Sequence, residues 1–414
     1  MATTINSRGS RLPSLRKLGG WVIVALAYFL GLVGFVIGFF GIAALVSSPA
    51  VFVGSGIAVG AVVVYAGSCL SARVLRSKRK VRYAAMHSGL FSVLLFGLIT
   101  TMLLKPLVPQ TSPVYLTPHE GVEYWDLRTG STVAVRHFPG EGNNTPIVYI
   151  HGGPGAYSVL WQPIVNTVSQ LSAAGHDVYF YDQVGGGLSQ RLDNIEAYSL
   201  TRHIEDLQAI RETIGAEKII VLASSFGATL TTNYMVEYPG SVALAVFSSP
   251  GPMYKPDWID QAEGSLDDTL SVADRDAFST MINRPRLFAA LILSDINAAA
   301  AVNFASEQEL GSFFDAIANR FYLRGAMCES SKIDAVSTGY GFWSNKMTGN
   351  TLLHRTDDPK PSLQHDSTPV LVLRGECDYK TKAVAEQYVS VFPNAILEDI
   401  QRAGHFLVYE QPEI

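Results

Sequence analysis

The sequence predicts an α/β domain with a mostly parallel sheet in residues 105–414, preceded by three apolar helices in residues 1–104. Charge separates the two parts: residues 1–104 hold ten Lys or Arg and no Asp or Glu, whereas residues 105–414 hold 21 basic and 36 acidic residues. Only the second part alternates short strand-like runs with helical periodicity, which is typical of a parallel sheet covered by helices. Its acidic balance argues against nucleic acid as a partner.

Three charge-free apolar runs fill the first part, namely residues 18–46, 50–70 and 84–104, of 29, 21 and 21 residues. About 20 helical residues cross the hydrocarbon core of a bilayer, so each run is long enough to span it. A cleaved signal peptide is the alternative for the first run, but that run is about twice as long as a signal-peptide core and two more follow it. We therefore expect residues 18–104 to bind the lipid bilayer as three transmembrane helices.

The basic residues predict how this anchor is oriented. Four of them precede the first run, none lies in the 47–49 turn, and six lie between the second and third runs. Because positive charge is retained on the cytoplasmic side, we expect the N-terminal segment 1–17 and the 71–82 loop inside. An odd number of spans then places the α/β domain on the extracytoplasmic side, with the cell membrane as the simplest location.

A proline-containing linker, residues 105–118, leads into the α/β domain. Strand-like runs rich in β-branched or aromatic residues follow at 133–138, 147–150, 178–181, 219–222, 243–247, 370–373 and 395–400. Apolar residues spaced by three or four predict a helix over 200–214, with Ser199 as its cap. Between 251 and 364 the strand pattern disappears, which predicts a helical cap inserted into a core of residues 119–250 and 365–414.

The first chemical motif is Ala223-Ser224-Ser225-Phe226-Gly227, between a strand and a helix-like run. A strand, a sharp turn and a helix form a nucleophile elbow, which holds a serine above the sheet edge. The usual pattern is Gly-x-Ser-x-Gly, and Ala223 occupies its first small position. We expect Ser225 to be the nucleophile, although so short a pattern also arises by chance.

The second motif, His151-Gly152-Gly153-Pro154-Gly155, directly follows a strand-like run. Acyl transfer places negative charge on a carbonyl oxygen, which backbone N–H groups can stabilise, and glycine lets the main chain approach closely. We expect the N–H groups of Gly153 and Phe226 to form an oxyanion hole, and the rest of the motif to line it. A simple Gly/Pro turn is the alternative.

Two further motifs complete a catalytic arrangement. Arg374-Gly375-Glu376-Cys377-Asp378 follows a late strand, and Ala403-Gly404-His405 follows the last one. The order Ser225, Asp378, His405 is that of the α/β-hydrolase triad. We expect His405 to move the serine proton and Asp378 to orient the imidazole. Glu376 and Asp399 are alternatives for the acid, in less favourable positions.

Taken together, residues 114–412 resemble an α/β-hydrolase of the proline iminopeptidase (serine peptidase S33) family. The resemblance rests on the second motif, on the run 182–189 (Asp-Gln-Val-Gly-Gly-Gly-Leu-Ser), on the serine elbow, and on the Asp378 and His405 motifs. It implies a helical cap over the pocket and release of an N-terminal residue, typically proline, from a small peptide.

Some residues depart from the family pattern. Val184 stands where the family has arginine, and the family's acidic cap motif, which binds the substrate amine, has no clear counterpart. The cap does contain acidic residues, most of which we expect to be solvated: Glu263, Asp267, Asp268, Glu307, Glu309, Asp315 and Glu329.

No cofactor or metal is expected, because the sequence has no clustered His, Cys and carboxylate set and no phosphate loop, and Gly185–Gly187 reads as a tight turn. Cys328 and Cys377 are placed where a disulfide is permitted, but two separate thiols are an equal alternative. Asn143-Asn144-Thr145 matches a glycosylation acceptor, which alone means little.

The leading hypothesis is therefore a membrane-anchored serine hydrolase that forms an acyl-enzyme, most simply an aminopeptidase acting on small peptides. An esterase, amidase or lactonase acting on another small acyl substrate is the second possibility within this class. A catalytically silent binding protein is a separate class, supported by Val184, Ala223 and the few residues after His405. Transport is disfavoured, because the three spans contain no internal charge.

Overall fold

The computed structural model describes residues 15–109, 113–259, 263–329 and 337–413, so most of the predicted basic N-terminal segment lies outside it. The chain divides into two compact units. The first contains Met1–Pro106 and Arg284–Ser306, and the second contains Leu107–Asn283 and Glu307–Ile414.

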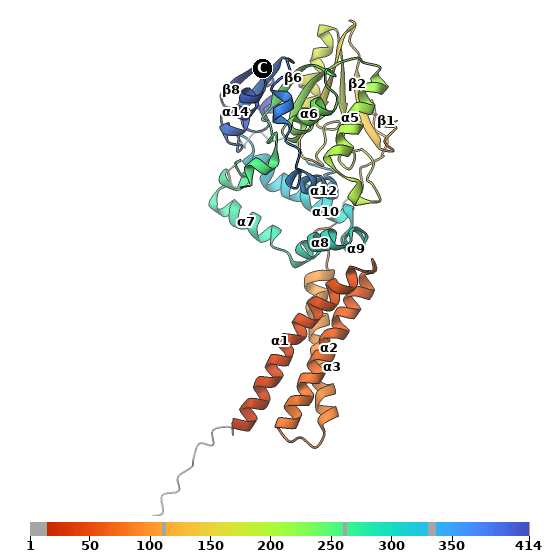
Figure 1. Ribbon diagram of the computed structural model, residues 1–414, viewed down its shortest axis with the longest axis vertical. Helices are drawn as coiled ribbons and strands as arrows, with labels where there is room; N and C mark the ends of the chain where they lie inside the picture. The colour runs from red at the N-terminus through yellow and green to blue at the C-terminus, as the bar shows by residue number, and fades with distance from the viewer. Residues whose placement is uncertain (1–14, 110–112, 260–262, 330–336, 414) are drawn as a thin grey trace, which may run out of the picture. The chain divides into compact units, whose positions relative to one another are not determined.

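The first unit contains the three predicted apolar helices: α1 (Leu15–Ala43), α2 (Pro49–Val74) and α3 (Lys80–Ile99), which ends in the π-helical turn η1 (Thr100–Leu104) (Figure 1). Each is long and apolar enough to cross a membrane. Glycines bring α1 and α2 close together, since a Cβ on Gly60 would lie 2.7 Å from the Gly31 carbonyl oxygen, and one on Gly38 would lie 3.0 Å from the Gly56 Cα. Small residues at such contacts are typical of helices that pack within a membrane.

The stretch 251–364, expected as one helical cap, is shared between the two units. Helices α8 (Pro285–Ile296) and α9 (Ala298–Phe304) belong to the first unit, where Phe304 packs against Phe39 and Phe52 with ring centroids 6.0 and 6.1 Å apart. The second unit keeps the remaining helical elements: η4 (Lys255–Trp258), η5 (Leu266–Asp268), α7 (Val272–Ile282), α10 (Glu307–Ile317), η6 (Ala318–Tyr322), α11 (Leu323–Gly325), α12 (Phe342–Leu353) and α13 (Lys360–Leu363).

The second unit is built on one eight-stranded sheet in the order β1-β2-β4-β3-β5-β6-β7-β8. Strands β1 and β2 pair antiparallel to their neighbours, and the others are parallel. The strands are β1 (Glu123–Asp126), β2 (Thr132–Phe138), β3 (Asn144–Ile150), β4 (His176–Tyr181), β5 (Ile219–Ser224), β6 (Val242–Ser248), β7 (Val370–Gly375) and β8 (Ala395–Ile400). The mostly parallel sheet predicted from the sequence is thus confirmed, and β1 is an additional edge strand.

Helices cover both faces of this sheet, as expected for parallel strands. One cluster of buried residues packs on each face of β3 in the described part of the sheet: Val148 and Ile150 belong to one, and Ile147 and Tyr149 belong to the other. Helix α5 begins as predicted, because the Ser199 side chain accepts a hydrogen bond from the Arg202 N–H at 3.1 Å. The helical elements of the core are α4 (Gln162–Val168), η2 (Ser169–Ala174), η3 (Ile195–Ala197), α5 (Leu200–Ile214), α6 (Phe226–Glu237), α14 (Lys382–Val391) and α15 (Leu407–Glu410).

A disulfide joins Cys328 to Cys377, with the two Cα atoms 5.3 Å apart. The sequence leaves open whether these two cysteines are bonded or are separate thiols, and in the structure they are bonded. Cys69, in α2, is a free thiol.

Candidate active site

Ser225 occupies the sharp turn between β5 and α6. Its backbone angles are φ 52° and ψ −119°, a region that a residue with a side chain rarely adopts and that is held only by surrounding structure. The Ser225 N–H donates to the Ser248 carbonyl at 3.1 Å. Gly227 must stay small, because a Cβ there would lie 2.3 Å from the Ile150 carbonyl oxygen. The turn predicted as a nucleophile elbow therefore has the geometry of one.

The loop of His151 to Gly155 follows β3 and lies directly against this serine. A Cβ on Gly152 would come within 2.9 Å of the Ser225 Cβ, so a side chain at that position would collide with the serine. Within the described ranges, no protein group accepts a hydrogen bond from the backbone N–H of Gly153 or Phe226. Both donors are thus available to an oxyanion, as the predicted roles require.

The buried side chain of His151 holds this loop in place through hydrogen bonds. Its ring is buried, and this burial lowers the pKa of His151. The negative charge of Asp182 acts in the opposite direction and raises it. Nε2 accepts a hydrogen bond from the Gln183 N–H at 2.9 Å, and Nδ1 lies 2.7 Å from the Gly152 carbonyl oxygen. A neutral ring with its proton on Nδ1 satisfies both contacts, so His151 positions the loop from a buried site.

Asp182, which the sequence analysis left without a role, holds two loops in place. It is fully buried, and its Oδ1 accepts hydrogen bonds from the N–H groups of Ser158 and Val159 at 2.7 and 2.9 Å. Its Oδ2 accepts from the Leu188 N–H at 2.9 Å. The run 182–189 therefore supports the segment that follows Gly155, and the Asp-Gln pair of the family motif was the available signal.

Asp378 and His405, from the ends of β7 and β8, form a buried pair with 2.8 Å between Oδ1 and Nδ1. Burial by itself raises the pKa of Asp378, but the charge and hydrogen bond of His405 and the Lys380 N–H outweigh it, so the pKa lies below its ordinary value. The His405 N–H donates to the Ala326 carbonyl at 2.7 Å, which fixes the backbone beside the ring.

The two alternative acids have other partners. Glu376 accepts a hydrogen bond from the Arg402 N–H at 3.1 Å, and Asp399 pairs with Lys382 and with Arg374 at the end of the sheet. Neither residue contacts His405 in the described part of the chain. Asp378 is therefore the carboxylate placed behind the imidazole.

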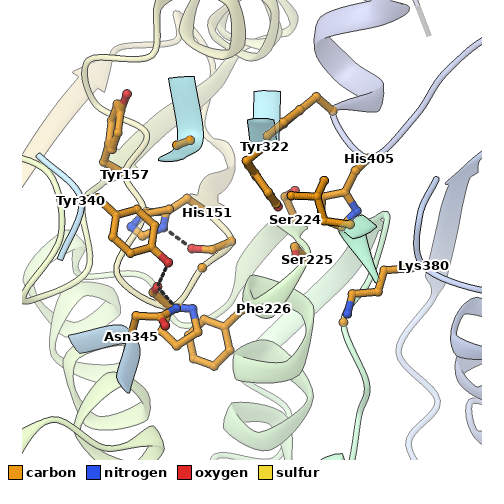
Figure 2. A pocket seen from close by; sticks show the side chains of 18 of the residues that line it. His151, Tyr157, Ser224, Ser225, Phe226, Tyr322, Tyr340, Asn345, Lys380 and His405 are labelled. Carbon is orange, nitrogen blue, oxygen red and sulfur yellow. Dashed lines mark hydrogen bonds between the residues drawn. The ribbon is translucent and has the colours of Figure 1, made fainter. Parts of the chain in front are cut away.

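Ser225 and His405 line the same cavity, but within the described ranges no hydrogen bond joins the serine hydroxyl to the imidazole (Figure 2). His405 Nε2 instead lies 3.4 Å from the Tyr379 hydroxyl, which is 3.1 Å from the Tyr322 hydroxyl. Serine–histidine bonds are often long before substrate binds. The tyrosine pair is a part of the site that the sequence did not reveal.

The cavity has a volume of about 500 Å³ and is lined mainly by apolar and aromatic side chains, including Trp161, Phe278, Phe314, Leu352 and Phe406. Among the residues that the structure describes, the lysine and carboxylate side chains that line it are Lys255, Glu263 and Lys380. Glu263 forms an ion pair with Lys255 and lies 3.4 Å from the Lys380 ammonium. Burial lowers the pKa of Lys380, while Glu263 opposes that shift.

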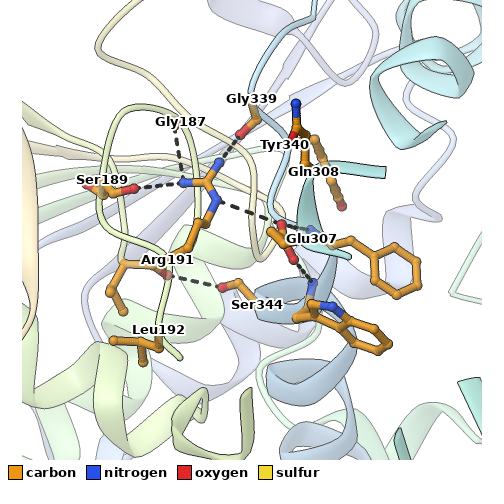
Figure 3. Close-up of polar contacts among 12 residues, drawn as sticks. Gly187, Ser189, Arg191, Leu192, Glu307, Gln308, Gly339, Tyr340 and Ser344 are labelled. Carbon is orange, nitrogen blue, oxygen red and sulfur yellow. Dashed lines mark hydrogen bonds and ion pairs between the residues drawn. The ribbon is translucent and has the colours of Figure 1, made fainter. Parts of the chain in front are cut away.

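Glu307, Glu309 and Asp315 of the cap are largely or fully buried, so the expectation that they are solvated is wrong for these three residues. Glu307 accepts hydrogen bonds from the N–H groups of Phe342 and Trp343 at 2.8 and 3.1 Å, and lies 3.7 Å from the guanidinium of Arg191 (Figure 3). Burial raises the pKa of Glu307, an effect that Arg191 reduces. Asp315 accepts from the Gly339 N–H at 2.8 Å.

Arg191, which sequence reasoning missed, links the glycine turn to these cap elements by donating to the carbonyls of Gly187, Ser189 and Gly339. Neither Glu307 nor Asp315 lines the cavity. Across the described residues, no group of three His, Cys, Asp or Glu side chains has a metal-binding arrangement.

Comparisons with known proteins agree with this architecture. Residues 145–412 match the α/β-hydrolase fold family. A proline iminopeptidase of Heyndrickxia coagulans is 27% identical over 294 residues, covering 69% of this chain and 92% of that protein. A putative 2-succinyl-6-hydroxy-2,4-cyclohexadiene-1-carboxylate synthase of Bacillus subtilis is 26% identical over 245 residues, covering 56% of this chain and 76% of that protein.

Among solved structures, DBJA shares the fold with a TM-score of 0.50 and 19% identity, over 70% of this chain and 93% of that one. The family match extends over more than half of the chain and includes the serine elbow, Asp378 and His405. The chain therefore belongs to the α/β-hydrolase fold family.

Proposed function

We propose that the protein is a membrane-anchored serine hydrolase that acts on small acyl substrates through an acyl-enzyme. The observation that carries this proposal is the buried 2.8 Å contact between Asp378 and His405, in the same cavity as a serine with positive φ. A histidine with a purely structural role requires neither a buried carboxylate partner nor a strained serine in the same cavity. The presence of both therefore favours a catalytic role.

In the proposed mechanism the Ser225 oxygen attacks the substrate carbonyl carbon while its proton passes to His405 Nε2. The His405 Nδ1–H donates to Asp378, whose charge stabilises the imidazolium that forms. The carbonyl oxygen becomes an oxyanion that accepts hydrogen bonds from the N–H groups of Gly153 and Phe226. His405 then protonates the leaving group, and a water molecule, activated by the same ring, releases the acyl group.

The charged groups of the cavity favour substrates without a free ammonium. An aminopeptidase needs uncompensated negative charge for its substrate's amine, but Glu263 already pairs with Lys255 and lies close to Lys380. Glu307 and Asp315 accept hydrogen bonds from backbone N–H groups and lie outside the cavity lining. We therefore place esters or amides with uncharged or anionic acyl parts first.

A proline-iminopeptidase type of aminopeptidase is the second candidate. The 27% identity to the Heyndrickxia coagulans protein and the His151 to Gly155 loop favour it. The two candidates share the triad and differ only in the charge that the cavity accepts.

Membrane anchoring is part of the same proposal. Three helices of sufficient length and apolarity support it, and the basic residues around them favour an extracytoplasmic hydrolase unit. The Cys328–Cys377 disulfide adds support, because disulfides persist in oxidising compartments outside the cytoplasm.

A fluorophosphonate probe tests the hydrolase assignment on the full chain in detergent. We expect labelling of the wild type and of Ser224→Ala, whose nucleophile is intact, and loss of labelling in Ser225→Ala. A folded wild-type protein that takes no label would reject the serine mechanism.

Matched substrates separate the two candidates. The same aryl ester and arylamide of proline are compared with the amine free and with the amine acylated. We expect faster turnover of the acylated forms, because they bring no ammonium to Lys255 and Lys380. Turnover restricted to the free-amine forms would establish the aminopeptidase instead.

A further inference from the structure

Helix α8 exposes a stripe of large apolar side chains. Phe288, Ile292 and Ile296 are 48%, 46% and 41% exposed and are spaced four residues apart, so they lie along one side of the helix. The opposite side is also apolar, with Leu287 and Leu293 buried within the first unit. A helix that is apolar on both sides is not typical of a protein surface in water.

Polar side chains attach the α8–α9 hairpin to one end of the three apolar helices. Asn297 Nδ2 donates to the Ala43 carbonyl at 2.9 Å, at the end of α1, and Asn303 Nδ2 donates to the Ser47 carbonyl at 3.1 Å, in the turn before α2. These bonds satisfy carbonyls that a helix end leaves without partners. The hairpin is thus fixed where α1 ends and α2 begins.

Arg286 makes the third attachment. Its guanidinium donates to the Leu103 carbonyl in η1 at 2.5 Å and to the Phe304 carbonyl at 2.7 Å, and it lies 4.7 Å from the centre of the Phe304 ring. The end of α3 therefore meets α8 at the same end of the bundle. The basic residues of the sequence predict this end to be extracytoplasmic.

The segments to which the α8–α9 hairpin is bonded also expose large apolar side chains. At the same end of the bundle, exposed apolar side chains surround the attachment points: Leu45, Val46, Val51, Leu98 and Met102. On an anchor that spans a bilayer, such side chains face lipid. Because α8 is bonded directly to the ends of these helices, we take lipid as the occupant of the stripe.

We propose that α8 is an interfacial helix whose Phe288, Ile292 and Ile296 side chains lie between the headgroups and acyl chains of the extracytoplasmic leaflet. The proposal rests on the membrane anchor proposed above. Asp295 is exposed on the same side in the last turn. A carboxyl group costs free energy to move among acyl chains, so α8 lies in the interface plane and does not insert deeply.

Site-directed spin labelling of the full chain in liposomes tests this. Because Cys328 and Cys377 are bonded, a Cys69→Ser background leaves no reactive thiol in the chain. A nitroxide is attached in turn to Phe288→Cys, Ile292→Cys and Ile296→Cys. Leu94→Cys in α3 (59% exposed) serves as the lipid control, and Val272→Cys in α7 (76% exposed) as the aqueous control.

We expect the three α8 labels to collide readily with oxygen and to lose most of their collisions with a water-soluble nickel complex, relative to the label at 272. Nickel access equal to that of the label at 272, with a lipid-like label at 94, would overturn the interfacial helix and leave the anchor standing. An aqueous label at 94 would overturn the anchor itself. Coupling between labels at 292, lost on dilution with unlabelled chains, would assign the stripe to a second copy and also overturn the proposal.

Discussion

The Cys328–Cys377 disulfide is placed to hold the two loops that carry the proposed acid and base. Cys377 directly precedes Asp378. On the other side of the bond, Ala326 accepts the His405 N–H at 2.7 Å, only two residues before Cys328. Replacing both cysteines by serine removes this connection without leaving either partner as an unpaired thiol.

The size of the effect follows from the loop that the bond closes. The two cysteines are 49 residues apart in the sequence. Loop-closure entropy for that length is about 14 cal/mol/K, or about 4 kcal/mol at 25 °C. A loss of that size lowers the melting temperature of a unit as large as the hydrolase unit by roughly 8 °C.

Thermal unfolding of the full chain in detergent, followed by circular dichroism, measures this difference. Cys69→Ser is the matched control, because it removes a cysteine from α2 and leaves the disulfide intact. We expect the Cys328→Ser/Cys377→Ser variant to melt earlier and to react more slowly with the fluorophosphonate probe, because the loops of Asp378 and His405 are less well fixed. An unchanged melting temperature together with an unchanged labelling rate would show that the disulfide does not fix these two loops.

Two other substitutions test the site, and a third tests the fold around it. Asp378→Asn should lower kcat by about 10⁴-fold in a protein that melts like the wild type, because the amide favours the wrong imidazole tautomer; steady-state kinetics measure this, and a loss below tenfold would argue for another acid. Gly152→Ala should lower kcat more than it raises KM, since its Cβ would lie 2.9 Å from the Ser225 Cβ, and unchanged kinetics would contradict the close approach. His203 is buried in α5, with Nε2 3.1 Å from the Thr348 hydroxyl oxygen, and His203→Gln should weaken the acid sensitivity of the fold. Burial lowers the pKa of His203 to about 3, so the unfolded chain binds a proton that the folded chain excludes, and stability falls by up to about 1.4 kcal/mol per pH unit as pH drops below about 6.5. Chemical denaturation between pH 7 and 5 checks this, and equal slopes in both proteins would be inconsistent with a buried neutral His203.

The sequence predicted the sheet well because its central strands are buried on both faces and read as continuous apolar runs. Edge strand β1 was missed because it has four residues, of which Glu123 and Asp126 are exposed. The division of the cap was also missed. Helix α8 is as apolar as a core helix, and only its contacts with Ala43 and Leu103 show that it belongs with the first three helices.

The candidate site likewise has a part that the sequence predicted and a part that it did not. Ser225, Asp378 and His405 were predicted because each lies in the loop or turn after a strand, and the ends of parallel strands meet at one edge of a sheet. Partners of buried groups could not be predicted, because they depend on side chains far apart in sequence. The ion pair of Arg191 with Glu307 and the contact of Tyr379 with His405 are examples.

Trapping the acyl intermediate tests directly whether Ser225 is the nucleophile. The full chain is mixed with an aryl ester, quenched in acid within the first turnover, and digested for peptide mass spectrometry. We expect one acyl group per chain, carried by Ser225 and absent from Ser225→Ala. Turnover of the ester by Ser225→Ala at the wild-type rate, or an acyl group on another residue, would contradict it.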